Sequence, residues 1–334
     1  MTDRIGVGVV GVGFGQSAHI PAFRAAECAI VALAASTESR ARAVAERVGI
    51  YHAYGDWRRL IADPAVRIVT IAVPPELQPE IAIAAARAGK AIFCEKPLAA
   101  RAADASAIAR EASAAGVVGV VDFEFPESAA WKRTRELVRS GELGPIRQVH
   151  IDWRVRTRPR ADSWKDREGT GGGVIGGFVS HSLYHLEWLV DRIVDLKARA
   201  RTTSTDDAAY DIWLRLAGGE FATISVATDI VGGPGHRIEI CGENATLVLE
   251  NPSTDHAGPF ALVRSEAAHR RTVVVDGGAG SFLDRRAALV ASLAARFVDA
   301  FRSGGPVEPS LASGARVQEL LDAVRTSAGR AVTA

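Results

Sequence analysis

The first feature that could support chemistry is a glycine-rich turn. Gly11, Gly13 and Gly15 surround Phe14 directly after a short apolar run, and a helix-compatible segment follows. In a dinucleotide-binding fold the first glycine permits a tight turn, and the second lets the backbone approach the pyrophosphate at the N-terminus of the next helix. The full fingerprint would place its third glycine at position 16, which is Gln16 here. The turn predicts a nicotinamide cofactor site, and the alternative is a glycine-rich turn without a ligand.

Polar residues at the end of the second apolar run bear on the choice of cofactor. A site that prefers NAD usually carries Asp or Glu about 20 residues after the glycines, where it binds the ribose 2′-hydroxyl. Here Ser36 and Thr37 stand at this point and Arg40 follows, a set that can bind a 2′-phosphate. We therefore predict NADP as the favoured cofactor. NAD is the alternative, because Glu38 could fill the acidic role.

Ionisable and aromatic side chains recur at helical spacing later in the chain. Tyr184, His185 and Trp188 follow His181 by three, four and seven residues, so all four share one face if the segment is helical. An imidazole titrates near pH ~6.5, which suits reversible proton transfer from a hydroxyl group. We predict His181 as general base or acid, and Tyr184 or His185 as a proton partner or a ligand of a substrate hydroxyl. The alternative is a packed core face, to which we assign Trp188.

The elements that position these residues alternate over the first 122 residues. Apolar runs that indicate buried strands cover residues 4–11, 29–35, 67–73, 91–93 and 117–123, and helix-compatible segments lie between them. Short strands joined by helices favour a parallel sheet, and right-handed crossovers make that sheet doubly wound. Residues 1–122 are therefore predicted to form a Rossmann domain.

Strand-like segments dominate from residue 123 onward. They are predicted at 146–157, 197–203, 208–216, 221–228, 236–241, 246–249 and 271–275, with helices at 130–140, 180–190, 283–302 and 314–326. Turn signals such as Gly218-Gly219 link several of the strands. We predict an α/β protein whose second domain, residues 123–334, is α+β with a large, mainly antiparallel open sheet.

The composition argues against several classes of protein. Forty Lys and Arg oppose 39 Asp and Glu, so no charge steers the chain toward nucleic acid or a membrane surface. Three cysteines lie far apart without a CxxC pair, which predicts neither a metal site nor a disulfide framework and favours a reduced, cytoplasmic compartment. We find no signal peptide and no apolar run of ~18 residues.

Six motifs in order resemble the Gfo/Idh/MocA family, the glucose–fructose oxidoreductase and inositol dehydrogenase group. They are GVGFGQSAHIPAF, the long segment from YGDWRRL to CEKPLA, GELGPIRQVHIDW, GGGVIGGFVSHSLYHLEWL, HRIEICGENATLVLE and GGPVEPSLASGARVQELLDAV. The resemblance covers nearly the whole chain and implies hydride transfer between nicotinamide and a hydroxyl or ketone of a sugar, cyclitol or sugar nucleotide. It also implies a homodimer or homotetramer formed through the second domain's sheet.

The resemblance assigns further residues. The lysine of the family's Glu-Lys-Pro motif maps onto Lys96, which would hydrogen-bond the substrate oxygen, and the histidine after the glycines maps onto His181. The predicted cofactor contacts also include Pro74, Glu95 and Lys96 itself, which follow two of the strands. Pro97 corresponds to a proline that is often cis.

Four positions depart from the family pattern. An aspartate often precedes the histidine by four residues, where this chain has Gly177, and another follows it by three, where the chain has Tyr184. A Pro-Pro-His-x-His motif is replaced at Glu76 and Gln78. The usual Lys/Asp/His trio is therefore incomplete, so either another group helps the lysine and histidine or the reaction differs.

Alternatives remain open at this stage. One is redox-assisted glycoside cleavage in which NAD is recycled, and another is a dinucleotide-binding regulator without catalysis. An alternating basic run, Arg154, Arg156, Arg158 and Arg160, suits either an anionic substrate such as a sugar nucleotide or a solvated edge strand.

Overall fold

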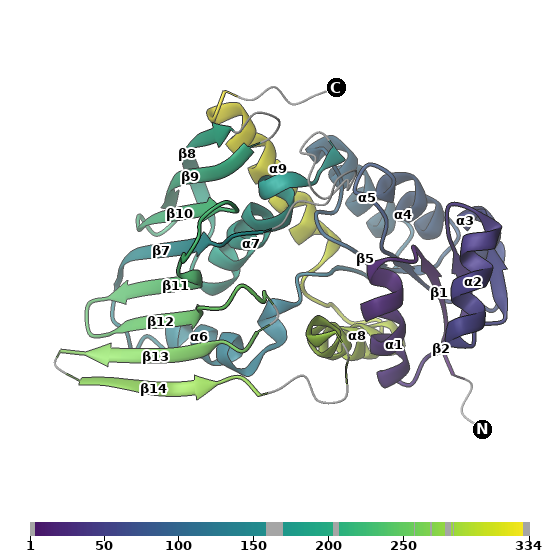
Figure 1. Cartoon of the computed structure of the whole chain (residues 1–334), viewed down its shortest axis with the longest axis horizontal. Coiled ribbons are helices and arrows are strands. Elements are labelled where there is room, and N and C mark those ends of the chain that lie inside the picture. Colours follow the sequence, from purple (N-terminus) through teal and green to yellow (C-terminus); the bar gives the residue numbers. More distant parts are fainter. Residues whose placement is uncertain are drawn as a thin grey trace. The chain divides into compact units, whose positions relative to one another are not determined.

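The computed structural model describes residues 4–157, 170–202, 207–256, 258–267, 269–277, 282 and 284–329. The chain divides into two compact units, whose helices and strands are drawn in Figure 1. The first unit comprises Met1–Glu124 and Ala279–Gln318, and the second comprises Phe125–Gly278 and Glu319–Ala334. This division differs from the predicted one of 1–122 and 123–334, because a late segment of the chain belongs to the first unit.

The first unit contains one parallel sheet. Its strands are β1 (Gly6–Val10), β2 (Ala29–Ala34), β3 (His52–Tyr54), β4 (Ile68–Ile71), β5 (Ala91–Cys94) and β6 (Gly119–Val121). The strand order is β3-β2-β1-β4-β5-β6, and every neighbouring pair is parallel. Every residue of β1, β4 and β5 is buried, as expected for strands covered by helices on both sides. The predicted doubly wound sheet is confirmed.

Helices follow the strands of this sheet. They are a π-helical turn η1 (Gly15–His19), α1 (Ile20–Ala25), α2 (Glu38–Val48), α3 (Trp57–Ala62), α4 (Gln78–Arg87), α5 (Ala102–Ala114) and α8 (Arg285–Ser303). The apolar face of α8 explains why the late segment joins this unit. Phe297 of α8 packs edge-on against Phe23 and Phe93, with ring centroids 6.3 and 5.7 Å away. Helix α9 (Leu311–Ser327) begins in the first unit and ends in the second.

The second unit is built on a mixed sheet. Its strands are β7 (Ile146–Arg154), β8 (Ile193–Thr202), β9 (Asp207–Leu216), β10 (Phe221–Ala227), β11 (Gly235–Gly242), β12 (Thr246–Asn251), β13 (Ala261–Glu266) and β14 (His269–Val275). The order is β14-β13-β12-β11-β7-β10-β9-β8, visible as one stack of arrows in Figure 1. Among the described pairings β7 and β10 run parallel and the others antiparallel, which confirms the predicted mainly antiparallel sheet.

The two faces of this second sheet differ in polarity. Along β7, Val149, Ile151 and Trp153 are buried, whereas Asp152 and Arg154 on the opposite face are paired with each other. A 3-10 turn η2 (Phe125–Glu127), α6 (Ala129–Arg139), a second π-helical turn η5 (Ile175–Val179) and α7 (Ser180–Leu189) complete the unit. Within the described part of the chain, every helix is too short or too polar to span a membrane.

Candidate active site

The glycine-rich turn has the shape that a dinucleotide requires. Gly11 has φ +111°, and a Cβ there would lie 2.2 Å from the Ala72 carbonyl oxygen, so only glycine fits. A Cβ at Gly13 would meet nothing within 4 Å, so the backbone faces open space that a pyrophosphate can approach. Gly15 packs tightly, because its Cβ would lie 3.1 Å from Val9 Cγ1. The glycine for close helix–strand packing is thus displaced by one residue, and the turn fits the cofactor.

Helix α8 reaches this turn with two residues that sequence reasoning missed. Asp284 caps α8 and pairs with Arg286, with Nη2 and Oδ2 2.7 Å apart. The Arg286 guanidinium lies 4.5 Å from the centroid of the Phe14 ring, a cation–π contact. The Ser17 hydroxyl lies 3.5 Å from the Asp284 carboxylate. No periodicity or motif signals these contacts, because almost 270 residues separate the partners.

The structure brings Ser36, Thr37 and Arg40 together. Thr37 caps α2 by accepting a hydrogen bond from the Arg40 backbone N–H at 3.3 Å, and Arg40 Nη1 donates to Ser36 Oγ at 2.8 Å. All three side chains are exposed. Glu38 is engaged elsewhere, because its carboxylate pairs with Arg42 at 2.7 Å on the surface of α2.

Lys96 sits in a turn that a buried amide fixes. The Lys96–Pro97 peptide bond is cis, and Lys96 itself is half-buried after β5. Pro74 accepts a hydrogen bond from Leu77 N–H at 2.9 Å in the turn that leads into α4, whose first residue is Gln78. The Gln78 Nε2 atom lies 3.2, 2.7 and 3.1 Å from the carbonyl oxygens of Glu95, Pro97 and Leu98. The departure at Gln78 therefore supplies donors that hold the lysine turn.

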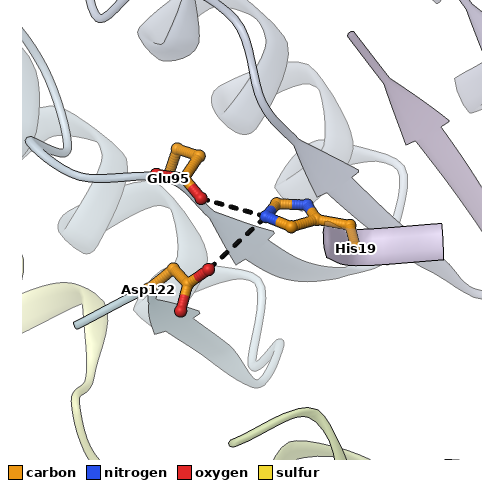
Figure 2. A group of neighbouring side chains, drawn as sticks. All are labelled: His19, Glu95 and Asp122. Carbon is orange, nitrogen blue, oxygen red and sulfur yellow. Dashed lines mark hydrogen bonds and ion pairs between the residues drawn. The ribbon is translucent and has the colours of Figure 1, made fainter. Parts of the chain in front are cut away.

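The buried side chain of His19 contacts Glu95 in the lysine turn and Asp122, which directly follows β6. Figure 2 shows the ring of His19 pointing one nitrogen between Glu95 and Asp122. His19 Nε2 lies 3.0 Å from Glu95 Oε1 and 3.5 Å from Asp122 Oδ2. His19 and Asp122 are buried, and 16 % of the Glu95 side chain is exposed. Glu95 Oε2 also accepts the Lys96 backbone N–H at 3.3 Å.

The pKa values of His19, Glu95 and Asp122 are shifted in different directions by burial and by their mutual contacts. Burial alone would lower the pKa of His19, but hydrogen bonds with Asp122 and Glu95 outweigh it and raise that pKa to about 9. Burial and the nearby Glu95 charge raise the pKa of Asp122 well above its usual value. Burial opposes the ionisation of Glu95, yet the bond with His19 leaves its pKa lowered. These shifts favour an imidazolium at His19, a carboxylate at Glu95 and the protonated form of Asp122.

Glu124 is a further carboxyl group near Lys96 in this unit. It follows β6 by three residues, and β6 lies beside β5 with Val121 in register with Cys94. Burial raises the pKa of Glu124 to about 7, against the opposing effect of the Lys96 charge. A signal for Asp122 and Glu124 was present in the sequence, because residues just past parallel strands gather at one edge of the sheet.

In the second unit, α7 carries the predicted catalytic face. His181, Tyr184 and His185 are all buried, and the ring centroids of the two histidines lie 5.4 Å apart. Phe125 contacts His181 edge-on at 5.0 Å. Trp188 is only half-buried, under the Arg135 guanidinium, so its assignment to the core is too simple.

His236 is a buried histidine that sequence reasoning missed. It lies opposite Trp153 in the β11–β7 register, and the two rings stack at 3.9 Å with an interplanar angle of 3°. Burial lowers its pKa to about 3, which keeps the imidazole neutral. Trp131 lies 4.2 Å from His185 and 5.7 Å from His236. These contacts place His185 in an aromatic cluster, which suits packing better than proton transfer.

Two other features singled out in the sequence, Gly177 and the alternating basic run, lie in the second unit. A Cβ at Gly177 would meet nothing within 4 Å, so packing does not exclude the carboxylate that relatives often carry there. In the alternating basic run, Arg154 is neutralised by Asp152. Arg158 and Arg160 lie outside the described residues.

Comparison with known proteins extends these observations. Residues 5–123 match the model of an oxidoreductase family with an NAD-binding Rossmann fold, and residues 131–248 match the GFO/IDH/MocA C-terminal domain. An uncharacterised oxidoreductase of Synechocystis sp. is 32% identical over 268 residues, covering 74% of this chain and 72% of that protein. A D-xylose 1-dehydrogenase (NADP+) of Haloferax volcanii is 34% identical over 208 residues, covering 61% of this chain and 62% of that protein.

Solved structures agree with the family models. A levoglucosan dehydrogenase in complex with NADH and levoglucosan matches with a TM-score of 0.87 and 25% identity, covering 98% of this chain and 97% of that one. The glycine-rich turn, the lysine turn and both folds thus agree with two family models and a full-length structural match. The chain belongs to the Gfo/Idh/MocA family of NAD-binding oxidoreductases.

Proposed function

We propose that this protein is an NADP-preferring dehydrogenase or reductase that acts on a CH–OH group or ketone of a sugar or cyclitol. The observation that carries the proposal is the fixed lysine turn, in which Gln78 and Glu95 hold the backbone around Lys96 in the same unit as the glycine-rich turn. The similarity to dehydrogenases named for levoglucosan and D-xylose supports the substrate class.

The roles of the chain's own residues follow from their chemistry. When bound, the nicotinamide accepts or supplies the hydride. Lys96 donates a hydrogen bond to the reacting substrate oxygen and favours negative charge there. His181 accepts the hydroxyl proton during oxidation and returns it during reduction. Tyr184 binds a substrate hydroxyl, and His185 packs behind it on the same helix.

The preference for NADP rests on the surface of α2. Arg40 presents a guanidinium beside the hydroxyl groups of Ser36 and Thr37, a donor set that suits a 2′-phosphate. Glu38 is paired with Arg42 and so is not directed to a ribose. These contacts support NADP over NAD.

Calorimetric titration with NADPH and NADH tests this preference. Arg40→Ala should weaken NADPH binding about 10- to 100-fold, because a hydrogen bond to a charged group contributes about 1.5–3 kcal/mol. NADH binding should stay within about threefold. Arg87→Ala is the control, since it removes an exposed arginine of α4 that pairs with Glu111 and leaves the Glu38–Arg42 pair intact. Equal loss of both cofactors in Arg40→Ala, or tighter binding of NADH by the unmodified chain, would contradict the proposal.

The proposal also covers the cellular compartment and the oligomeric state of the protein. Cys28, Cys94 and Cys241 are free thiols, which supports a reducing, cytoplasmic compartment. We propose a homodimer or homotetramer formed through the sheet of the second unit, supported by the exposed apolar side chains of Trp213 and Phe221 on the paired strands β9 and β10. Light scattering of the purified protein would measure the oligomer, and a monomer would overturn it.

A further inference from the structure

The buried cluster of His19, Glu95 and Asp122 has no part in the proposed chemistry, yet it is bonded to the lysine turn. Glu95 is the link. Its Oε2 atom accepts the Lys96 backbone N–H at 3.3 Å, and its Oε1 atom lies 3.0 Å from His19 Nε2. The inference drawn from this cluster rests on the proposed function, because it concerns how Lys96 is held.

His19 and Asp122 are each held by contacts outside the cluster. His19 ends the π-helical turn after the glycines and packs edge-on against Phe14 and Phe93, at 5.6 and 5.1 Å. Asp122 is fixed by its backbone, whose N–H donates to the Cys94 carbonyl at 2.8 Å. The three side chains therefore meet because three separate elements direct them to one point, as Figure 2 shows.

Charge balance decides how many protons such a cluster holds. An unpaired buried charge costs several kcal/mol, and two carboxylates at one point repel each other. One imidazolium, one carboxylate and one neutral acid give a net charge of zero and satisfy the short contacts. The neutral acid has an O–H that can donate to Glu95, while its other oxygen accepts from His19.

We propose that His19, Glu95 and Asp122 form a net-neutral positioning unit for Lys96, in which His19 is the imidazolium, Glu95 the carboxylate and Asp122 the protonated acid. The raised pKa of His19, the lowered pKa of Glu95 and the raised pKa of Asp122 agree with this distribution. Loss of the His19 proton at alkaline pH removes the imidazolium to which Glu95 is bonded and loosens the turn that carries Lys96.

Other ionisable groups face the cluster and shape its response to pH. The thiol of Cys94 stays neutral, since burial raises its pKa well above the usual value. Lys96 favours the ionised form of Glu95, as does His19. Glu124 adds negative charge near Asp122 when it ionises, and Arg286 acts on both Glu124 and Glu95. Above pH ~7 the ionised Glu124 therefore helps to retain the proton on the cluster.

A cation bound in place of the proton is the competing account. One ligand atom from each of the three side chains lies within 4.8 Å of the other two. The 3.0 Å separation of His19 Nε2 and Glu95 Oε1 is, however, that of an ordinary hydrogen bond, which a shared proton explains. The experiment below separates the two accounts.

Substitutions in the full chain test the assignment of charges. Asp122→Asn keeps one acceptor and one donor and so copies a protonated acid, whereas Asp122→Ala removes both. Glu95→Gln removes the carboxylate that the imidazolium requires. We expect Asp122→Ala and Glu95→Gln each to lower kcat about 10- to 100-fold, the range for losing a hydrogen bond to a charged group. Asp122→Asn should recover most of the activity that Asp122→Ala loses.

The pH profile is the readout that a merely structural role would not move. For the unmodified protein, kcat should fall as pH rises through about 9, the value for His19. His19→Gln should lose this alkaline limb. The matched control is His52→Gln, which alters a histidine paired with Asp63 at 2.8 Å but 42 % exposed, and it should keep the limb.

Three outcomes overturn the proposal. The charge assignment is wrong if Asp122→Asn is as damaging as Asp122→Ala while Glu95→Gln is harmless. An alkaline limb that persists in His19→Gln excludes His19 as its source. A fall in Tm after dialysis of the unmodified protein against a chelator, restored by Zn²⁺ or Mn²⁺, would assign the site to a metal. If the protein turns over no sugar, the pH dependence of Tm in these variants still tests the cluster. A failure of the proposed function can therefore be told apart from a failure of the charge assignment.

Discussion

Replacing His19 with glutamine should remove a defined part of the protein's pH-dependent stability. The pKa of this histidine rises from 6.5 to about 9 on folding, because the bonds with Asp122 and Glu95 outweigh burial. A group whose pKa is higher in the folded state contributes stability that is complete below its unfolded pKa and is lost as pH rises through its folded pKa. The window for His19 is therefore pH 6.5 to about 9.

The size of the effect follows from the same shift. Each pKa unit corresponds to about 1.4 kcal/mol, so a rise from 6.5 to about 9 is worth about 3 kcal/mol in the free energy of unfolding. Glu124, whose pKa of about 7 lies above its usual 4.5, makes both proteins less stable as pH rises from 4.5 to about 7. Glu124 is present in both proteins, and above about pH 7 it is ionised, so its contribution no longer changes with pH there.

Urea unfolding across this pH range measures the difference. The advantage of the unmodified protein over His19→Gln should shrink by about 3 kcal/mol between about pH 6 and about pH 10. His52→Gln serves as the control, because solvent screens its partly exposed pair with Asp63. If the two stability curves ran parallel, the imidazolium state of His19 and the reasoning built on it would be refuted.

Three substitutions probe the site itself. Lys96→Ala should lower kcat at least about 100-fold, because one donor to developing charge contributes about 3–4 kcal/mol. Cofactor binding measured by calorimetry should stay within about threefold, and full activity would exclude a catalytic role for the lysine. Gln78→Ala should lower the free energy of unfolding by about 2–3 kcal/mol, since its amide serves three carbonyls, and an unchanged urea midpoint would contradict that role. Gly177→Asp should fold with an unchanged Tm, because a Cβ at this position meets nothing within 4 Å. It should raise kcat severalfold if the carboxylate completes the Lys/Asp/His trio, and a large fall in Tm would show that the space for the side chain is absent.

Much of the fold could be predicted because its signals are local. The strands of the first unit are short apolar runs, and helices end at glycines such as Gly49, which has φ +69°. Helical spacing predicted that His181 and His185 share a face of their helix, and their ring centroids lie 5.4 Å apart. Strand β3 and helix α3 escaped prediction because both are short and β3 is half-buried.

The rest depends on contacts between distant parts of the chain. Nothing near Phe297 in the sequence indicates that it packs against Phe23 in the first unit. The meeting of His19 with Asp122 likewise requires the parallel sheet, in which the ends of β5 and β6 lie at the same edge as the turn after β1. Cysteine spacing, on which the expectation of no metal site was based, cannot reveal a cluster of one histidine and two acidic residues that lie far apart in the sequence.

Hydride transfer between a nicotinamide and a polyhydroxylated substrate is the reaction to which the fold and the lysine turn point. The most direct test mixes the purified protein with NADP+ or NAD+ and with levoglucosan, D-xylose or myo-inositol, and follows the absorbance of the reduced nicotinamide. We expect the cofactor to be reduced with at least one of these substrates, faster for NADP+ than for NAD+, and we expect Lys96→Ala to abolish this reduction. Turnover that is undiminished in Lys96→Ala, or no turnover together with no calorimetric binding of either cofactor, would contradict this expectation.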